Sequence, residues 1–280
     1  MTNSVMTQQK TTLVLGGTGK TGRRVAQRLG ERGLPVRIGS RSAHPPFDWE
    51  DQATWAPALR DVGSLYVTYF PDVSLPQAPG AIGSFTELAL ASGVRRLVML
   101  SGRGEETAEV CEKIIQDSGA EWTIIRASWF AQNFSEDYLL EPVVSGEVAL
   151  PAGDIAEPFV DVDDIADIAV AALTDDGHVG RLYEVTGPRP LTFAEAIAEI
   201  AKATGRNLRF VQVSPEQYAA AAAAQGVPAE VIELLTYLFT TVLDGRNARV
   251  TDGVRRALGR QPRDFADYAR DAAATGVWDV

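Results

Sequence analysis

The stretch TTLVLGGTGKTGRRVAQRL, residues 11–29, constrains the fold more than any other part of the chain. An apolar run ends at glycines, and apolar positions with helical spacing follow at Val25, Ala26 and Leu29. This order indicates a buried strand, a tight turn and a helix, which is the first half of a strand–helix–strand unit. Gly33 is expected to end the helix.

Two phosphate-binding patterns compete for this glycine-rich turn. A P-loop requires G-x-x-x-x-G-K-[ST], and Gly19-Lys20-Thr21 supplies its end, but Val14 stands where the first glycine should be. Gly16, Gly19 and Gly22 instead fit the G-x-x-G-x-x-G spacing of dinucleotide-binding reductases. In such a turn the first glycine permits the bend, the second lets the backbone approach the pyrophosphate, and the third allows close helix packing. We therefore expect a bound dinucleotide.

The end of the second apolar run, in the sequence RIGSRS, bears on which dinucleotide this is. An acid at this place holds the ribose diol of NAD, whereas an arginine accommodates the 2′-phosphate of NADP. Here there is no acid, and Ser40 and Arg41 occupy the place, with Arg37 nearby. A guanidinium binds phosphate bidentately, so the sequence favours NADPH, with NADH possible.

Strand-like and helix-like segments alternate along the first half of the chain. The expected strands are 11–15, 34–40, 64–70, 95–101 and 121–127, with helices at about 20–32, 54–61, 79–92 and 105–118. This alternation predicts an α/β fold, a Rossmann-type doubly wound parallel sheet with a smaller C-terminal α/β substrate lobe. We expect a flexible leader at 1–10, the NAD(P)-binding domain at 11–150, and the lobe at 151–280, with 179–187 returning to the main sheet.

Composition excludes several classes of protein. The net charge of −11 and the lack of a Lys/Arg run argue against a nucleic-acid partner and an anionic membrane surface. A single cysteine excludes a disulfide framework, and no metal site is expected. Asp163 or Asp164 is expected to cap a helix instead of binding a metal. The single cysteine and the lack of a long apolar run predict a cytoplasmic protein. We also expect a small-molecule substrate and a monomer or homodimer, although composition does not set the oligomeric state.

The chain resembles the NmrA-like branch of the atypical short-chain dehydrogenases/reductases along nearly its whole length. Within the branch it is most similar to bacterial relatives of the ergot-alkaloid reductases, the festuclavine/agroclavine dehydrogenase group. The segments that carry the resemblance are LGGTGKTG, VRIGSR, SGVRRLVMLSG, SGAEWTIIRASWFAQNF, PFVDVDDIADIAVAAL and YEVTGPRPLTFAEAIAEIA.

The resemblance implies an NADPH-dependent oxidoreductase that transfers hydride to a small cyclic or aromatic acceptor such as an iminium, a quinone or an activated alkene. The branch also holds a regulator that binds the dinucleotide without turnover. A non-catalytic NAD(P)-sensing protein that acts through a protein partner is therefore the alternative.

The resemblance also implies a set of cofactor-binding residues. They lie in the glycine turn, at the ends of the strands and in the loops that follow them. The set is Gly16, Thr18, Gly19, Lys20, Thr21, Gly22, Ser40, Arg41, Asp48, Trp49, Thr68, Tyr69, Phe70, Ser101, Gly102 and Arg103.

One departure from the short-chain reductases concerns the proton donor. The Tyr-x-x-x-Lys pair of the classical members falls on Gly104 and Ala108, and Lys113 stands in the wrong register. A carbonyl reductase needs an acid for the developing alkoxide, whereas an iminium does not, so the missing pair favours undemanding acceptors. Substitute donors are Tyr69, Ser101 and Tyr138.

Aromatic residues in the segments that follow the strands predict the substrate pocket. Ligands of open α/β sheets bind outside the carboxyl ends of the strands. The expected pocket residues are Trp129, Phe130, Asn133 and Tyr138, with Tyr237 and Phe239 placed to close it. Side chains that fill this pocket would favour the sensor over the enzyme.

Overall fold

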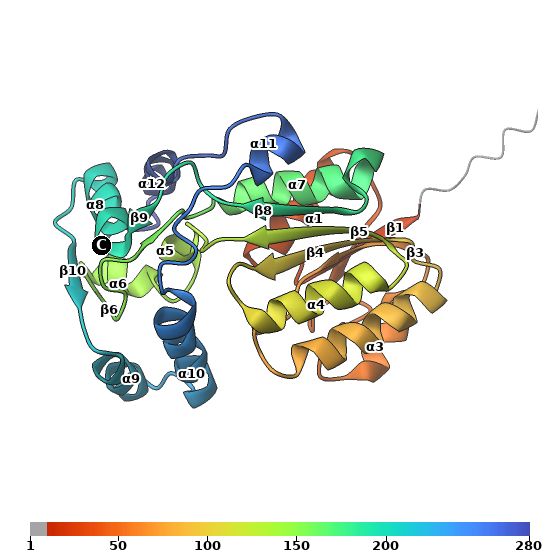
Figure 1. Ribbon diagram of the computed structural model, residues 1–280, viewed down its shortest axis with the longest axis horizontal. Helices are drawn as coiled ribbons and strands as arrows, with labels where there is room; N and C mark the ends of the chain where they lie inside the picture. Colours follow the sequence, from red (N-terminus) through yellow and green to blue (C-terminus); the bar gives the residue numbers. More distant parts are fainter. Residues whose placement is uncertain (1–9) are drawn as a thin grey trace, which may run out of the picture. The chain divides into compact units, whose positions relative to one another are not determined.

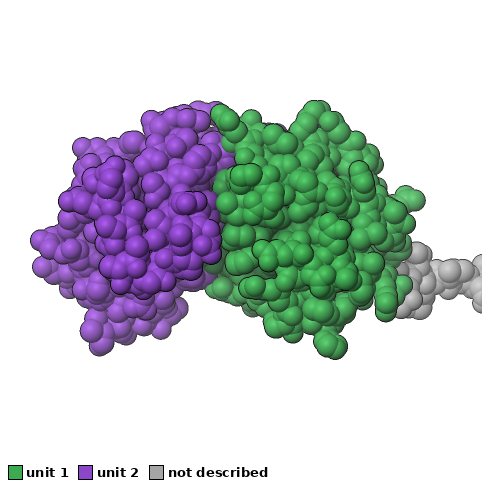
Figure 2. Space-filling view, turned by 90° about the horizontal axis from the view of Figure 1, so that it is seen from below, with its two compact units in different colours: residues 1–101, 106–125, 166–182 green, residues 102–105, 126–165, 183–280 purple. Residues whose placement is uncertain are grey.

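The structure is a computed structural model that describes residues 10–280. Apart from Lys10, the expected leader lies outside the described residues. The chain divides into two compact units, coloured separately in Figure 2. The first comprises the described residues up to Ser101 with 106–125 and 166–182, and the second comprises 102–105, 126–165 and 183–280. This division differs from the predicted boundary at residue 150, because 126–150 belong to the second unit.

A six-stranded sheet has the strand order β2-β1-β3-β4-β5-β8. The pairs β1–β2, β1–β3 and β3–β4 are parallel. The expected doubly wound α/β fold is thereby confirmed, and 179–187 does return to the sheet through β8. The strands are β1 (Thr11–Leu15), β2 (Val36–Gly39), β3 (Val62–Val67), β4 (Arg96–Gly102), β5 (Glu121–Ala127) and β8 (Arg181–Val185).

Helices cover both faces of this sheet. Figure 1 shows α3 and α4 on one face and α7 on the other. The Arg28 side chain of α1 donates to Asp167 of α7 at 2.9 Å, which places these two helices together. The bounds of these elements are α1 (Lys20–Glu31), η1 (Gln52–Thr54), α2 (Trp55–Ala58), α3 (Ala78–Ala91), α4 (Glu106–Asp117), α7 (Val162–Thr174) and η2 (Asp176–His178).

The order of the strands creates a switch point between β1 and β3. The chain leaves β1 toward one edge of the sheet to form β2 and then crosses back to form β3 on the other side of β1. Ligands of doubly wound sheets bind at such a point, outside the carboxyl ends of the strands. The glycine turn follows β1 at this position.

Most of the remaining elements belong to the second unit. It contains two small sheets, one of β6 with β10 and one of β7 with β9. Their bounds are β6 (Glu147–Leu150), β7 (Ala156–Glu157), β9 (Leu191–Thr192) and β10 (Arg209–Gln212). The helices are α5 (Asn133–Glu136), α6 (Leu140–Ser145), α8 (Phe193–Thr204), α9 (Pro215–Ala224), α10 (Ala229–Tyr237), η3 (Leu238–Val242), α11 (Gly253–Leu258) and α12 (Phe265–Ala274).

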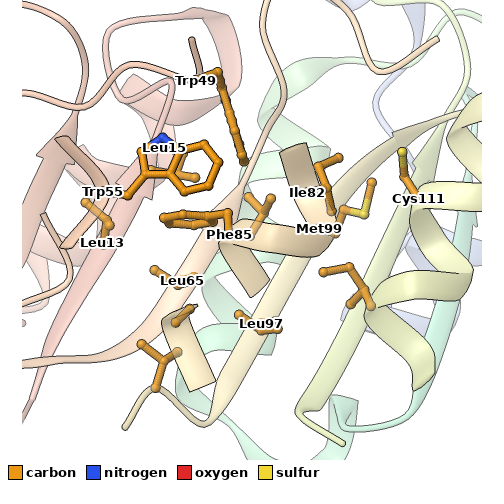
Figure 3. Close-up of a cluster of buried hydrophobic side chains, with 14 of the residues drawn as sticks. Leu13, Leu15, Trp49, Trp55, Leu65, Ile82, Phe85, Leu97, Met99 and Cys111 are labelled. Carbon is orange, nitrogen blue, oxygen red and sulfur yellow. The ribbon is translucent and has the colours of Figure 1, made fainter. Parts of the chain in front are cut away.

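Each unit has a hydrophobic core of its own. In the first unit the rings of Trp49, Trp55 and Phe85 pack together, with ring centroids 5.3 to 6.0 Å apart (Figure 3). The second core gathers aromatic side chains from distant parts of the sequence. Its Trp278 is fully buried and donates its indole N–H to the carbonyl of Phe134 at 2.8 Å.

The start of α7 corrects one prediction. Asp161 accepts a hydrogen bond from the backbone N–H of Asp163 at 2.8 Å, so Asp161 caps the helix. The fully buried Asp164 instead pairs with Arg260, at 2.7 Å, and with Arg263. The expectation that Asp163 or Asp164 caps the helix was therefore wrong. Asp164 and its arginine partners lie almost a hundred positions apart in the sequence, and a local sequence pattern cannot reveal such ion pairs.

Candidate functional site

The glycine turn has the backbone that the spacing predicts. Gly16 has φ +60°, and a Cβ there would lie 2.5 Å from the Thr68 hydroxyl oxygen. A Cβ on Gly22 would lie 2.3 Å from the carbonyl oxygen of Gly16, so only glycine lets α1 pack this close to the turn. The backbone at Gly16 and Gly22 therefore has the geometry that the predicted turn requires. Gly19 leaves more room, because a Cβ there would lie 3.2 Å from the same carbonyl oxygen.

The N-terminus of α1 is open to an anion. Gly19 is the N-cap residue, no side chain caps the helix, and its first turn holds no acid. Thr18 and Gly19 are exposed, whereas Thr21 is buried. The helix dipole and the N–H groups of the first turn favour negative charge at such an end. The turn therefore fits the pyrophosphate of a dinucleotide.

The loop after β3 is tied to the same turn. The Thr68 hydroxyl donates to the carbonyl of Leu15 at 3.1 Å, and the Trp49 indole N–H donates to the carbonyl of Thr68 at 3.0 Å. Tyr69 packs on Trp49 with ring centroids 5.0 Å apart. The structure thus brings Thr68 and Tyr69 to the switch point. Trp49 is 8% exposed and belongs to the core, so in this structure it anchors the loop.

Just after β2 lies Arg41, a cation with no carboxylate partner among the described residues. Arg41 is exposed, and its guanidinium carbon lies 5.4 Å from the ring centroid of Phe70, which is itself 63% exposed. Such a stack occupies the face of the guanidinium and leaves its N–H edge available. Arg37 is not available in this way, because it donates to the carbonyls of Ala58 and Arg60 at 2.7 and 2.5 Å.

A groove of about 530 Å³ runs along this edge of the first unit, with Thr18, Ser40 and Ser42 among the residues that line it. Asp48, which was predicted to bind the cofactor, is half-buried and accepts from the backbone N–H of Glu50 at 3.1 Å. It therefore stabilises its own loop.

The substitute proton donors have different surroundings. Ser101 is buried and donates its hydroxyl to Glu112 at 2.6 Å, which leaves it no proton for a substrate in this arrangement. Burial raises the pKa of the Tyr69 phenol, and Glu50 and Cys111 raise it further. Lys113 is exposed and pairs with Asp117 at 2.7 Å. With its pKa raised, the Tyr69 phenol keeps its proton at neutral pH.

The segment Gly102–Glu105 belongs to the second unit, and its backbone does not suit a tyrosine at Gly104. Gly104 has φ +80°, and a Cβ there would lie 2.3 Å from the side-chain nitrogen of Asn247. A tyrosine cannot occupy this position without displacing Asn247. Arg103, predicted to bind the cofactor, is 4% exposed and donates to Glu184 and to the carbonyl of Asn247, each at 2.5 Å. Its guanidinium is thus engaged within the unit.

The predicted pocket residues meet in an aromatic cluster of the second unit. The Phe239 ring lies 5.1 Å from that of Trp129 and 6.4 Å from that of Tyr138, centroid to centroid. Burial raises the pKa of Tyr138 well above its ordinary value, so this phenol is neutral and can donate. Phe130 lies just before α5 and Asn133 begins that helix, where the Asn133 N–H donates to the carbonyl of Phe130 at 3.2 Å.

Sequence reasoning missed Glu157. Its side chain is fully buried, one carboxyl oxygen accepts from Ser128 at 3.0 Å, and the other has no partner among the described residues. Burial raises the pKa of Glu157 to about 7, against the opposing effects of Ser128 and Arg103. Glu157 follows no motif, and the only sequence signal was a carboxylate directly before the apolar PFV segment.

Within residues 10–280, no group of three or more His, Cys, Asp or Glu side chains is placed to hold a metal ion. Among the described helices, none combines the length and apolar character needed to cross a bilayer.

Known proteins resemble this chain in sequence and in fold. The model of the NmrA-like family matches residues 107–269, which is more than half of the chain. The uncharacterized oxidoreductase YesF of Bacillus subtilis is 33% identical over 286 residues, covering 98% of this chain and 99% of that protein. Agroclavine dehydrogenase of Claviceps fusiformis is 31% identical over 280 residues, covering 93% and 96%.

Among solved structures, the NADPH-dependent quinone oxidoreductase QOR2 of Escherichia coli, in complex with NADPH, has a TM-score of 0.75. It is 21% identical to this chain, and the match covers 93% of this chain and 99% of that one, which shows a common fold. The glycine turn, the strand order and these matches together lead to one conclusion: the chain belongs to the NmrA-like family.

Proposed function

We propose that this protein is an NADPH-dependent reductase that transfers hydride to a small cyclic or aromatic acceptor, such as an iminium, a quinone or an activated alkene. The observation that carries the proposal is the glycine turn, with Gly16 at positive φ, an uncapped α1 N-terminus and exposed Thr18 and Gly19. The bound cofactor supplies the hydride, and the protein supplies orientation and electrostatics. Named oxidoreductases and dehydrogenases among the relatives support this function.

The preference for NADPH is supported by the end of β2. Arg41 carries its charge at an exposed position, and none of its N–H groups donates to a described protein acceptor. A 2′-phosphate would give the guanidinium two acceptor oxygens. Ser40, which borders the groove next to it, adds a hydroxyl donor.

The acceptor class is supported by the surroundings of the expected proton donors. Gly104 and the fully buried Ala108 replace the usual pair, and the Ser101 hydroxyl is engaged by Glu112. An acceptor whose reduction creates little negative charge needs no strong acid. Where a proton is needed, the neutral phenols of Tyr69 and Tyr138 are the candidates.

The test is NADPH oxidation at 340 nm against iminium, quinone, enone and ketone acceptors, with NADH in parallel. In Gly19→Val the new side chain stands over the turn, and turnover and NADPH binding should both be lost. The matched control is Gly30→Val, because Gly30 is an exposed glycine of α1 with no atom within 4 Å of an added Cβ. Equal activity in both variants would contradict the assigned cofactor site.

The sensor stays as a second candidate because of Phe239. Its ring is 2% exposed and packs on the rings of Trp129, Tyr138 and Phe193. Aromatic side chains therefore fill the region where the substrate pocket was expected. Tight NADPH binding with no turnover of any acceptor would favour the sensor. The monomeric or dimeric state, the cytoplasmic location and the absence of a nucleic-acid partner stay predictions, and size-exclusion chromatography tests the first.

A further inference from the structure

A second groove lies at the opposite edge of the sheet from the glycine turn. The turn follows the carboxyl end of β1, whereas this groove of about 570 Å³ is lined by residues at the amino ends of β1, β3 and β4. Thr12, Ser64 and Arg96 lie there in adjacent register on the three strands. Everything that lines it belongs to the first unit.

Three cations lining this groove have no carboxylate partner within ion-pair distance among the described residues. Lys10 donates to the carbonyl of Gly93 at 3.3 Å, and Arg32 donates to the Thr174 hydroxyl at 3.3 Å. Arg95 is exposed, and its guanidinium donates to no described acceptor. All three positive charges are therefore left unneutralised in one concave surface.

The groove also holds two carboxylates, Glu121 and Asp175, against its four cations. Arg96 pairs with Glu121 at 3.2 Å and with Asp176 at 2.7 Å. Asp175 keeps its negative charge, because the Thr174 hydroxyl that donates to it at 3.2 Å is neutral. The groove thus keeps an excess of positive charge in a protein whose net charge is −11. Like charges gathered in one concavity repel one another, and an anion that bridges them relieves this repulsion.

The groove also has a polar floor and an apolar wall. The Thr12 and Ser64 hydroxyls lie 2.7 Å apart, and Thr12 is 7% exposed. Leu34, Pro35 and Leu173 line the groove with apolar surface. Gly63 leaves room for the Lys10 side chain to lie along the floor, because an added Cβ at Gly63 would lie 2.6 Å from the Lys10 Cβ.

We propose that this groove binds a phosphorylated small molecule, at a site separate from the dinucleotide site. Lys10, Arg32 and Arg95 hold the phosphate, and the organic part faces the apolar wall. Phosphate is favoured over a single carboxylate because one phosphate monoester brings close to two negative charges and three acceptor oxygens to the three cations. The proposal does not depend on the reductase activity.

The experiment is a calorimetric titration of inorganic pyrophosphate into the full-length protein saturated with NADPH, at low ionic strength. We expect one site, whose affinity falls at least about tenfold in Arg95→Glu, because a charge-assisted contact is lost and a repulsion is added. NADPH affinity should be the same in Arg95→Glu and in the unaltered protein. The matched control is Arg60→Glu, which makes the same charge change at an exposed position of the first unit outside this groove.

Three results would overturn the proposal. The first is the absence of pyrophosphate binding to the NADPH-saturated protein. The second is an equal loss of affinity in Arg95→Glu and Arg60→Glu, which would reflect only the overall charge. The third is release of NADPH by pyrophosphate, which would place the anion in the glycine turn. Because NADPH binding is followed separately, failure here is distinguishable from failure of the reductase function.

Discussion

Replacing Glu157 by glutamine should make the protein's stability less dependent on pH. The Glu157 carboxyl is fully buried, with a hydrogen bond from Ser128 on one oxygen and no described partner on the other. Burial raises its pKa from 4.5 to about 7, Ser128 and Arg103 oppose this, and Asp244 adds to it. Glutamine keeps an acceptor for the Ser128 hydroxyl and cannot ionise.

The sign and the size follow from the pKa. Because the folded-state pKa lies above the unfolded one, the folded protein holds more protons between pH 4.5 and 7. The stabilisation is complete below pH 4.5 and is lost as the pH rises through about 7. This pKa difference corresponds to about 3 kcal/mol in the free energy of unfolding.

The assay is urea unfolding of both proteins at several pH values from 5 to 8. Relative to Glu157→Gln, the unaltered protein should lose about 3 kcal/mol of unfolding free energy as the pH rises, with a fall in Tm of several degrees. Taking the difference cancels other titrating groups, including Asp161, whose pKa burial also raises. Glu230→Gln, at an exposed position, is the control. A difference between Glu157→Gln and the unaltered protein that stays constant with pH would refute the reasoning.

Three other substitutions test separate parts of the structure. Arg41→Ala should weaken NADPH binding roughly tenfold to a hundredfold and leave NADH binding unchanged, because a charge-assisted contact with the 2′-phosphate is lost. Fluorescence titration measures the affinity for each cofactor. An equal loss of affinity for NADPH and NADH would contradict the assignment of Arg41 to the 2′-phosphate. Asp164→Ala should lower the free energy of unfolding by about 2 kcal/mol, because Arg260 and Arg263 lose their buried partner while their own partial exposure limits the loss; urea unfolding would show it. A loss below about 0.5 kcal/mol would contradict this pairing. Gly104→Ala should lower Tm because of its φ of +80° and the 2.3 Å approach to Asn247, whereas the helical control Gly30→Ala should not.

The parts of the fold that the sequence predicted well are those set by residues close together along the chain. The β1–turn–α1 segment could be placed almost to the residue, because an apolar run, a positive-φ glycine and a 3.6-residue period all act within one stretch of sequence. The expected strand at 64–70 instead runs from Val62 to Val67. Thr68 to Phe70 lie beyond it in the loop, where their side chains reach the switch point.

The unpredictable part depends on partners far along the chain. Nothing local shows that Arg103 pairs with Glu184 or that Asp164 pairs with Arg263. Trp49 was predicted from the loop sequence as a cofactor contact, and no local pattern shows that Phe85, which lies in α3, packs against it in the core. Glu157 escaped notice because its burial results from the folding of the whole second unit.

The burial of Trp278 has a consequence for synthesis on the ribosome. Its indole hydrogen bond to Phe134 spans 144 positions, as does the contact between Arg103 and Asn247. A nascent chain therefore displays the surface around Phe134 for as long as it takes to make these later residues, even after most of the sheet has emerged. The second unit can be completed only when residue 278 has left the exit tunnel.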